Sequence, residues 1–160
     1  MSIDEVSELI TEMYQTDQAS WKTGKSNDDF IRKHTIKMKK IVSRFGCIDI
    51  TRFGQDVSHF AWLLVQHSNH DITFQESYLE LMKESGDVLK RDIAYLTDRI
   101  LINKKEPQLY GTQMDPATHA TDYRPFPILD EITVDLRRKK MGLCPLSEHI
   151  KNMHEKYPPH

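Results

Sequence analysis

Histidine side chains concentrate in one stretch of the sequence, Gln55–Gln75, which reads QDVSHFAWLLVQHSNHDITFQ. Imidazole groups titrate near neutral pH and can pass protons or bind metal ions, so their spacing here suggests chemistry. Drawn as a helix at about 100° per residue, the stretch gathers imidazole and amide groups on one face, at His59, Gln66, His67 and His70. A solvent-exposed face would normally carry Lys, Glu and Arg. We therefore expect this face to line a partly buried cleft.

His67 is the predicted general acid or base of that cleft, and His70 is a second catalytic candidate. Asp98 is expected to orient His67 or to stabilise its charged form. No Ser or Cys lies in a nucleophile motif. Acid/base hydrolysis, elimination or isomerisation is therefore favoured over covalent acyl transfer. The expected ligand is a small anionic or polar molecule, or a peptide.

A set of polar side chains is predicted to bind that substrate: Arg99, Gln66, Gln113, Tyr110, Thr112 and Gln75. Arg99 would hold a substrate carboxylate or phosphate through paired N–H groups. Gln113 and Tyr110 would donate hydrogen bonds to an oxyanion that develops during the reaction. These roles require the side chains to share one water-accessible cavity with His67.

A metal site is an alternative use of the same histidines. His67 and His70 are spaced i, i+3, so both could face one divalent ion such as zinc, with His59 or Asp98 as the third ligand. HxxH is a weaker signature than HExxH, and no second-shell Glu follows at the usual offset. The sequence therefore predicts no metal and no other cofactor.

A non-catalytic interpretation explains the same residues. Buried polar side chains usually find structural hydrogen-bond partners. The histidines could be satisfied by neighbouring carbonyls, and Asp98 and Arg99 could form an ion pair between helices. The chain would then be a binding or interaction protein, such as an immunity or accessory factor, with a protein partner. Convergence of the predicted site residues on an open pocket would favour the enzyme.

The composition bounds these hypotheses. A chain of 160 residues with a net charge of −2 predicts a single domain over residues 1–160 and argues against a nucleic-acid-binding protein that relies on a basic face. The longest uncharged apolar run, Phe60–Val65, is too short to span a membrane. The N-terminal residues lack the pattern of a signal peptide. Cys47 and Cys144 are isolated, so no disulfide framework is expected. A cytoplasmic protein follows as the expectation.

Hydrophobic periodicity predicts a mainly α fold, a bundle of about six to seven helices. The predicted helices cover residues 3–15, 28–45, 55–68, 73–85, 88–103 and 131–141, with a short last helix from Pro145. Asp71 or Thr73 would cap the fourth helix, which should form an αα-hairpin with the third. In the helix at 131–141, Ile132 and Leu136 are expected to face the core. The remaining segments are predicted as a loop over 17–27, a connection with marginal strand character over 47–54 and a frayed end over 155–160.

A late insertion, about residues 107–128, is the predicted exception to the helical pattern. Its prolines, among them Pro116 and Pro125, exclude a long helix. Tyr110–Met114 and Tyr123–Phe126 are expected to pair as a short β-hairpin across the DPATHAT turn. This hairpin would carry part of the predicted site on a loop-like element that the helices hold in place.

The segments AWLLVQHSNHDITFQ, RDIAYLTDRILI and PQLYGTQ resemble a family of small bacterial proteins that is catalogued as a domain of unknown function. The resemblance extends over most of the chain and implies no particular activity. It implies that the recurrent polar positions are Gln66, His67, His70, Asp71, Gln75, Asp98, Arg99, Tyr110, Gly111, Thr112 and Gln113. The family pattern has Arg, Asp, Asn and Trp-Pro where this chain has Trp21, Ile31, His34 and Cys47-Ile48. If those positions bind a ligand, the resemblance implies altered specificity or lost activity in this member.

Overall fold

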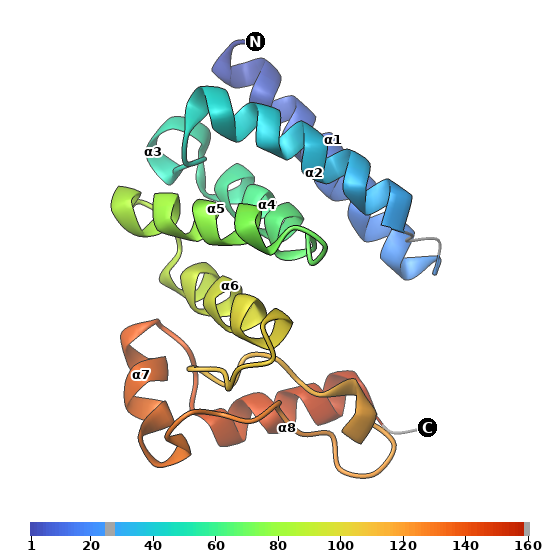
Figure 1. The fold of residues 1–160 in the computed structure, drawn as a ribbon, viewed down its shortest axis with the longest axis vertical. Coiled ribbons are helices and arrows are strands. Elements are labelled where there is room, and N and C mark those ends of the chain that lie inside the picture. Colours follow the sequence, from blue (N-terminus) through green and yellow to red (C-terminus); the bar gives the residue numbers. More distant parts are fainter. Residues whose placement is uncertain (25–27, 159–160) are drawn as a thin grey trace. The chain divides into compact units, whose positions relative to one another are not determined.

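The computed structural model describes residues 1–24 and 28–158, which fold into eight α-helices and two short 3-10 helices (Figure 1). The mainly α prediction is confirmed. The chain divides into two compact units, Met1–Asp92 and Ile93–His160, each with its own internal packing. The prediction that the chain forms a single domain stays a prediction.

The first unit is organised around one central helix. Its helices are α1 (Ile3–Lys22), α2 (Asp28–Phe45), α3 (Ile50–Phe53), α4 (Gln55–Gln66) and α5 (Ile72–Ser85), and α6 (Lys90–Asn103) begins within it. Helix α4 packs against α1, α2, α3 and α5. Figure 1 shows α1 and α2 running side by side, and these two helices also contact each other.

Local sequence signals explain where these helices begin. Ser2 and Glu5 form a capping box at the start of α1, with hydrogen bonds of 3.2 and 2.6 Å between the side chain of one and the backbone N–H of the other. Asp71 caps α5, since its Oδ1 accepts the N–H of Phe74 at 3.0 Å. Because this cap starts α5 only a few residues after α4 ends, the two helices form the predicted αα-hairpin.

Helix α1 is longer than the sequence analysis predicts. It continues to Lys22 and carries Asp17, which is buried at 1 % exposure, so the loop expected from residue 17 is wrong over its first part. Residues 25–27 of that loop lie outside the described residues. The connection at 47–54 contains the short helix α3 instead of a strand-like segment, because Asp49 caps it by accepting the N–H of Arg52 at 2.9 Å. This added helix is one reason why the predicted count of six to seven is too low.

The second unit holds the rest of α6 and the elements η1 (Pro116–Thr118), η2 (Glu131–Thr133), α7 (Val134–Lys140) and α8 (Leu146–Lys156). Helix α7 packs on η2 and α8. Ile132 and Leu136 are 97 % and 66 % exposed, so their predicted inward orientation is wrong, and Val134 and Arg138 are buried in their place. Helix α8 continues to Lys156, past the start of the end predicted to fray, and residues 159 and 160 lie outside the described residues.

The predicted β-hairpin is wrong. Among the described residues there is no strand, and the segment at 107–128 forms only isolated bridges, between Gln108 and Ile128 and between Met114 and Pro125. Pro125 and Pro127 lack backbone N–H groups at alternate positions, so a ladder cannot extend along this segment. The buried Gln108 side chain takes the place of the missing ladder.

Each end of the Gln108 amide bonds to backbone groups of this segment. Its Oε1 accepts the Gln113 N–H at 2.9 Å, and its Nε2 donates to the carbonyls of Gln113 and Phe126 at 3.0 and 2.9 Å. Because the side chain supplies these bonds, the segment is held without the regular pairing of a sheet.

Candidate functional site

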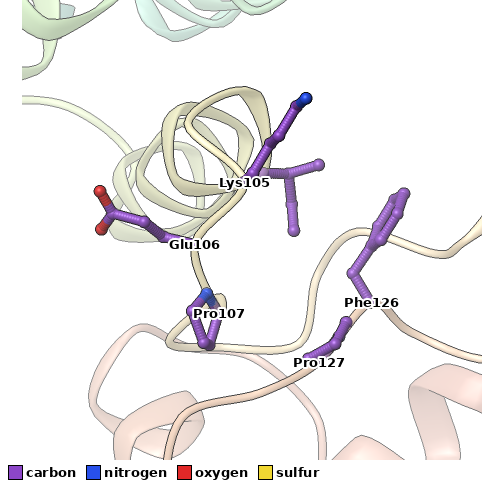
Figure 2. A pocket seen from close by; sticks show the side chains of 6 residues that line it. Lys105, Glu106, Pro107, Phe126 and Pro127 are labelled. Carbon is purple, nitrogen blue, oxygen red and sulfur yellow. The ribbon is translucent and has the colours of Figure 1, made fainter.

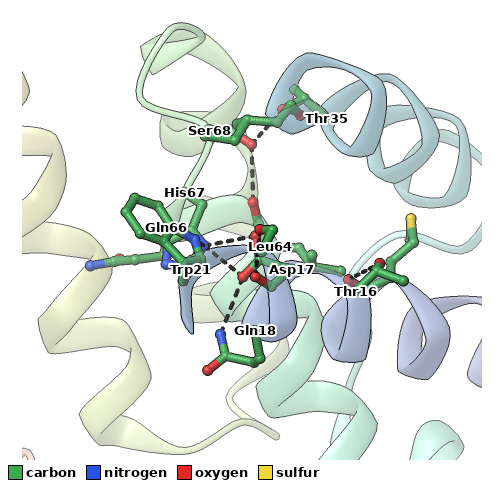
Figure 3. Close-up of polar contacts among 12 residues, drawn as sticks. Thr16, Asp17, Gln18, Trp21, Thr35, Leu64, Gln66, His67 and Ser68 are labelled. Carbon is green, nitrogen blue, oxygen red and sulfur yellow. Dashed lines mark hydrogen bonds and ion pairs between the residues drawn. The ribbon is translucent and has the colours of Figure 1, made fainter. Parts of the chain in front are cut away.

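A histidine and a buried carboxylate from two helices of the first unit form a close pair (Figure 3). His67 is the C-cap residue of α4, and its Nδ1 lies 3.1 Å from Oδ1 and 3.0 Å from Oδ2 of Asp17 in α1. The side chains are 18 % and 2 % exposed, respectively. The carboxylate is therefore enclosed, while part of the imidazole reaches the surface.

Two contacts of His67 Nδ1 require opposite tautomers of the ring, and the choice between them assigns the position of the proton. The Trp21 Nε1–H also lies 3.3 Å from the same Nδ1, but one nitrogen cannot accept that bond while donating to Asp17. A carboxylate only accepts, so Nδ1–H donates to Asp17 and the lone pair of neutral His67 is at Nε2. The Trp21 ring, 5.2 Å from the imidazole centre, then covers the histidine.

Neighbouring polar groups hold the pair in position. The Gln18 amide donates to Asp17 Oδ2 at 3.2 Å. Directly after His67, the Ser68 hydroxyl donates to the Leu64 carbonyl at 3.1 Å and lies 2.8 Å from the hydroxyl of Thr35 in α2 (Figure 3). Helices α1 and α2 thus both form polar contacts with the C-terminal end of α4, through Asp17 and Thr35 respectively. These contacts hold His67 and the residue that follows it in place.

A second imidazole lies near the same carboxylate. His34 in α2 is 8 % exposed, and its ring is 4.3 Å from that of Phe30. Its buried Nδ1 finds no hydrogen-bond partner among residues 1–24 and 28–158. Burial lowers the pKa of His34, and the negative charge of Asp17 opposes that change. His34 also lines a hollow of about 370 Å³ together with Phe30, Lys33, Ile36 and Lys37. The hollow therefore combines apolar surface with two lysines and a histidine.

The pair is suited to proton transfer. When His67 Nε2 takes a proton, the positive charge on the ring is stabilised by the Asp17 carboxylate at Nδ1. Burial of Asp17 strengthens this interaction, because little water screens it. The same ring can return the proton from Nε2 in a later step.

The other predicted residues of the first unit have different surroundings. His70 lies in the turn between α4 and α5 and is largely exposed. The partial burial of its ring lowers its pKa, and the nearby charge of Arg32 acts in the same direction. Gln66 is the buried last residue of α4. Gln75 is fully buried, and its amide donates to the carbonyls of Val65 and Gln66 at 3.2 Å each. It thus provides donors for carbonyls that have no partner within the last turn of α4.

A second histidine–carboxylate pair joins α4 to the start of α6. His59 Nδ1 is 2.8 Å from Oδ2 of Asp92, the side chains are 31 % and 3 % exposed, and the His59 ring stacks on Trp62 at 4.8 Å. Asp92 Oδ1 is buried and forms no hydrogen bond within the described part of the chain, although the Arg91 Nε lies 3.9 Å from it. Burial raises the pKa of Asp92, and the His59 hydrogen bond acts in the opposite direction.

Asp98 of the second unit is enclosed by a loop of its own unit. Its Oδ1 accepts the N–H groups of Leu109 and Tyr110 at 2.8 and 3.0 Å, and its Oδ2 accepts the N–H and hydroxyl of Thr112 at 2.9 and 2.8 Å. Burial raises the pKa of Asp98, and these bonds oppose the change. The carboxylate holds the Leu109–Thr112 turn, and the prediction that it orients His67 stays a prediction.

The remaining predicted substrate-binding residues also lie in the second unit. Arg99 has a buried Nε that finds no hydrogen-bond partner in the described part of the chain, and burial lowers its pKa. Gln113 is 8 % exposed, and its amide donates to the Thr112 hydroxyl at 2.9 Å. The Tyr110 carbonyl accepts from the guanidinium of the buried Arg138 at 2.6 Å. The Tyr110–Gln113 turn is thus held by buried bonds.

Sequence reasoning missed Asp17 and Trp21, although one signal was present. The apolar stripe of α1 runs through Val6, Ile10 and Met13, and the next position of the stripe is Asp17. A carboxylate in register with a buried stripe indicates a buried charge that needs a partner. The sequence offered no means of choosing His67 as that partner.

Two further findings concern the described residues as a whole. No group of three or more His, Cys, Asp or Glu side chains in residues 1–24 and 28–158 is placed to hold a metal ion. No helix in that part of the chain combines the length and apolar character needed to cross a membrane.

Comparison with known proteins yields one match. A family model described as "Family of unknown function (DUF6624)" matches residues 7–159. No curated protein and no solved structure matches the chain.

Proposed function

We propose that this chain, which belongs to the DUF6624 family of unknown function, is a small enzyme with His67 as its general acid or base. The observation that carries the proposal is the His67–Asp17 pair: a partly exposed imidazole whose Nδ1 lies within 3.1 Å of a buried carboxylate. General acid/base catalysis needs an imidazole held in one tautomer with its other nitrogen available for the substrate. Asp17 supplies that orientation.

The substrate class is a small anionic or polar molecule. Cations of α2 lie near both histidines, since the charge of Arg32 lowers the pKa of His70 and that of Lys37 lowers the pKa of His34, although nearby carboxylates act on both in the opposite direction. The hollow at His34 adds Lys33 and apolar walls from Phe30 and Ile36. Positive charge beside a partly apolar surface favours an anion with a small apolar body. Hydrolysis, elimination and isomerisation of such a molecule each include proton transfers that His67 Nε2 would carry out: it would take a proton from the attacking water in hydrolysis, or from carbon in the other two, and return it to the leaving group or the product.

A non-catalytic binding or interaction protein is the second candidate, and one observation favours it. Asp98 accepts four hydrogen bonds from the Leu109–Thr112 turn, and Arg138 donates to the carbonyls of Tyr110 and Cys144 at 2.6 Å each. Buried groups that are satisfied in this way stabilise a fold without taking part in chemistry. Under this interpretation the polar positions of the second unit maintain a surface for a protein partner.

We also propose a cytoplasmic location. Cys47 is buried and Cys144 half-buried, and both are free thiols. Free thiols are typical of a reducing compartment.

Site-directed substitution tests the enzymatic proposal. The chain is assayed against a panel of chromogenic phosphate esters, carboxylate esters and small hydroxy acids, and any activity found is measured again in three variants. His67→Asn should lower kcat by about 100-fold or more, and Asp17→Asn by about tenfold or more. His59→Asn is the matched control, because it removes the other histidine–carboxylate pair of α4 and should leave activity nearly unchanged.

The outcome of this assay separates the two candidates. An activity that survives His67→Asn assigns the chemistry elsewhere and overturns the proposal. An activity lost equally in the His59 and His67 variants reports damage to α4 and also counts against it. Circular dichroism of each variant shows whether the helical fold is retained.

A further inference from the structure

The second unit contains a small pocket at the C-terminal end of α6 (Figure 2). It encloses about 280 Å³ and is lined by Ile102, Lys105, Glu106, Pro107, Phe126 and Pro127. None of these residues was a predicted site residue. The lining is mainly apolar, with charged groups only at Lys105 and Glu106, which is the usual composition of a site for a small organic molecule.

Hydrogen bonds on both sides keep the walls of this pocket in place. The Gln108 N–H donates to the Pro127 carbonyl at 2.9 Å, and the Gln108 amide donates to the Phe126 carbonyl at 2.9 Å. The Phe126 N–H donates to the Gln113 carbonyl at 3.0 Å. Because Pro107 and Pro127 have fixed φ angles, little order has to be gained when a ligand enters.

Lys105 adopts an unusual backbone conformation at the rim. Its φ of 61° places it in the left-handed region, and the turn it makes has the two bonds of a Schellman motif, Glu106 N–H to Leu101 and Lys105 N–H to Ile102, at 2.9 Å each. Glycine normally occupies this position, as Gly86 does at the end of α5. A lysine at this position carries a conformational cost that glycine would avoid, which suggests that its side chain has a role.

The charges at the rim favour an anion. Lys105 forms no ion pair with the described residues. Figure 2 shows Glu106 on the opposite side of the chain from Phe126. The Lys105 side chain extends away from Pro107 and Pro127, so its ammonium group has to turn towards them to meet a carboxylate in the pocket. The carbonyls of Leu101 and Ile102, which would repel an anion at a helix C-terminus, already accept hydrogen bonds of the turn.

We propose that this pocket binds a small carboxylate with an apolar body. The body would lie against Phe126 between Pro107 and Pro127, and the carboxylate would pair with the ammonium group of Lys105. This site is separate from the His67 proposal and does not depend on it.

Binding of benzoate tests this assignment, with one uncharged analogue (benzamide) and one cationic analogue (benzylamine) for comparison. NMR titration follows the backbone amide signals of Ile102 and Phe126 while benzoate, benzamide or benzylamine is added. Benzoate should shift both signals and bind about fivefold or more tightly than benzamide. Benzylamine, which is a cation, should bind more weakly still.

Two variants of Lys105 keep the test independent of folding. Lys105→Gln removes the charge, and Lys105→Gly removes it while relieving the left-handed backbone, so the glycine variant should have a higher Tm than the wild type. Both should lose the preference for benzoate over benzamide. Lys139→Gln, which removes an exposed lysine from α7 outside the pocket, should keep it.

Several results would overturn the proposal. Equal affinity for benzoate and benzamide would remove the role of the charge. Tighter binding of benzylamine would assign the site to Glu106. Retention of the benzoate preference in Lys105→Gly, or no shift of the Ile102 and Phe126 signals with benzoate, would show that the pocket does not hold the carboxylate.

Discussion

The Nδ1 of His67 lies within 3.1 Å of both carboxylate oxygens of Asp17, a residue 50 positions earlier in the sequence. The contact joins the end of α4 to the last turns of α1, and it encloses the carboxylate almost completely. An enclosed carboxylate with one imidazole partner makes each residue sensitive to the loss of the other. Several measurements follow from this relationship and from the contacts of the second unit.

The energies of Asp17 and His67 should be coupled. His67→Ala leaves a buried carboxylate without its partner and should lower the free energy of unfolding by about 1–3 kcal/mol. Asp17→Asn in the His67→Ala background removes the unpaired charge, so the double variant should be more stable than the sum of the single effects predicts. Urea unfolding of the four proteins gives the coupling energy. Strict additivity would show that the pair contributes no interaction energy.

The tautomer of His67 should be the one with a proton on Nδ1. Neutral histidine in water prefers the proton on Nε2, so this assignment depends on the carboxylate acceptor. Long-range ¹H–¹⁵N NMR, recorded above the pH range in which imidazole titrates, distinguishes the two tautomers. Asp17→Asn should shift the population towards Nε2–H. A wild-type protein already in the Nε2–H form would contradict the proposed direction of the hydrogen bond.

The stability of the first unit should carry a pH dependence from Asp92. Burial raises the pKa of this carboxyl in the folded chain above its ordinary value of 3.8, which applies to the unfolded chain. Between the pKa of the unfolded chain and the higher pKa of the folded chain, the folded chain therefore binds more protons. The contribution of Asp92 to the free energy of unfolding is therefore largest at low pH and falls as pH rises through this window. Asp92→Asn should lose that slope.

Urea unfolding at a series of acidic pH values, in the wild type and in Asp92→Asn, measures this difference. The wild type should lose stability relative to the variant as pH rises through the window. A relative gain over the same range would mean that the His59 hydrogen bond outweighs burial and lowers the pKa of Asp92.

Gln108 should be essential for the structure of the Pro107–Ile128 segment. Gln108→Leu keeps the side-chain volume but removes the partner of the Gln113 N–H and of the Phe126 carbonyl, and one of the two donors to the Gln113 carbonyl. The free energy of unfolding should fall by about 3 kcal/mol, and hydrogen exchange of the Gln113 amide should accelerate. Gln55→Leu, at an exposed position, serves as the control and should change stability by about 0.5 kcal/mol or less. Equal effects of the two substitutions would contradict the assigned role.

Gly111 should tolerate a side chain less well than Gly142 does. A Cβ at this position would lie 2.8 Å from the terminal carbons of Ile128 and of Leu146, and its φ of 67° is left-handed. Gly142 has nearly the same φ, 69°, but nothing within 4 Å of its Cβ position. Both substitutions add backbone strain, and Gly111→Ala also forces the ends of the Ile128 and Leu146 side chains to move, so it should destabilise the chain by about 1 kcal/mol more than Gly142→Ala. Thermal unfolding of both variants compares them directly.

The sequence by itself determined the elements whose signals are local. The mainly α class, helix α2 and the αα-hairpin of α4 and α5 follow from periodicity and from capping residues a few positions apart, although the structure was needed to choose Asp71 over Thr73 as the cap of α5. The polar character of the α4 face was also readable, because it depends only on residue types at helical spacing. Local signals were weaker near residue 17, where the polar residues after Met13 concealed the continuation of α1.

Only the tertiary structure decided which groups meet. Asp17 as the partner of His67, and Gln108 in place of a β-ladder, depend on contacts between segments that periodicity does not relate. The prolines that exclude a helix between residues 107 and 128 also limit the pairing of this segment as β-strands. The buried Gln108 amide supplies hydrogen bonds to backbone groups that a sheet would otherwise have paired. A local pattern states what a residue can do, whereas a hydrogen bond or an ion pair exists only when the folded chain brings its second atom within reach.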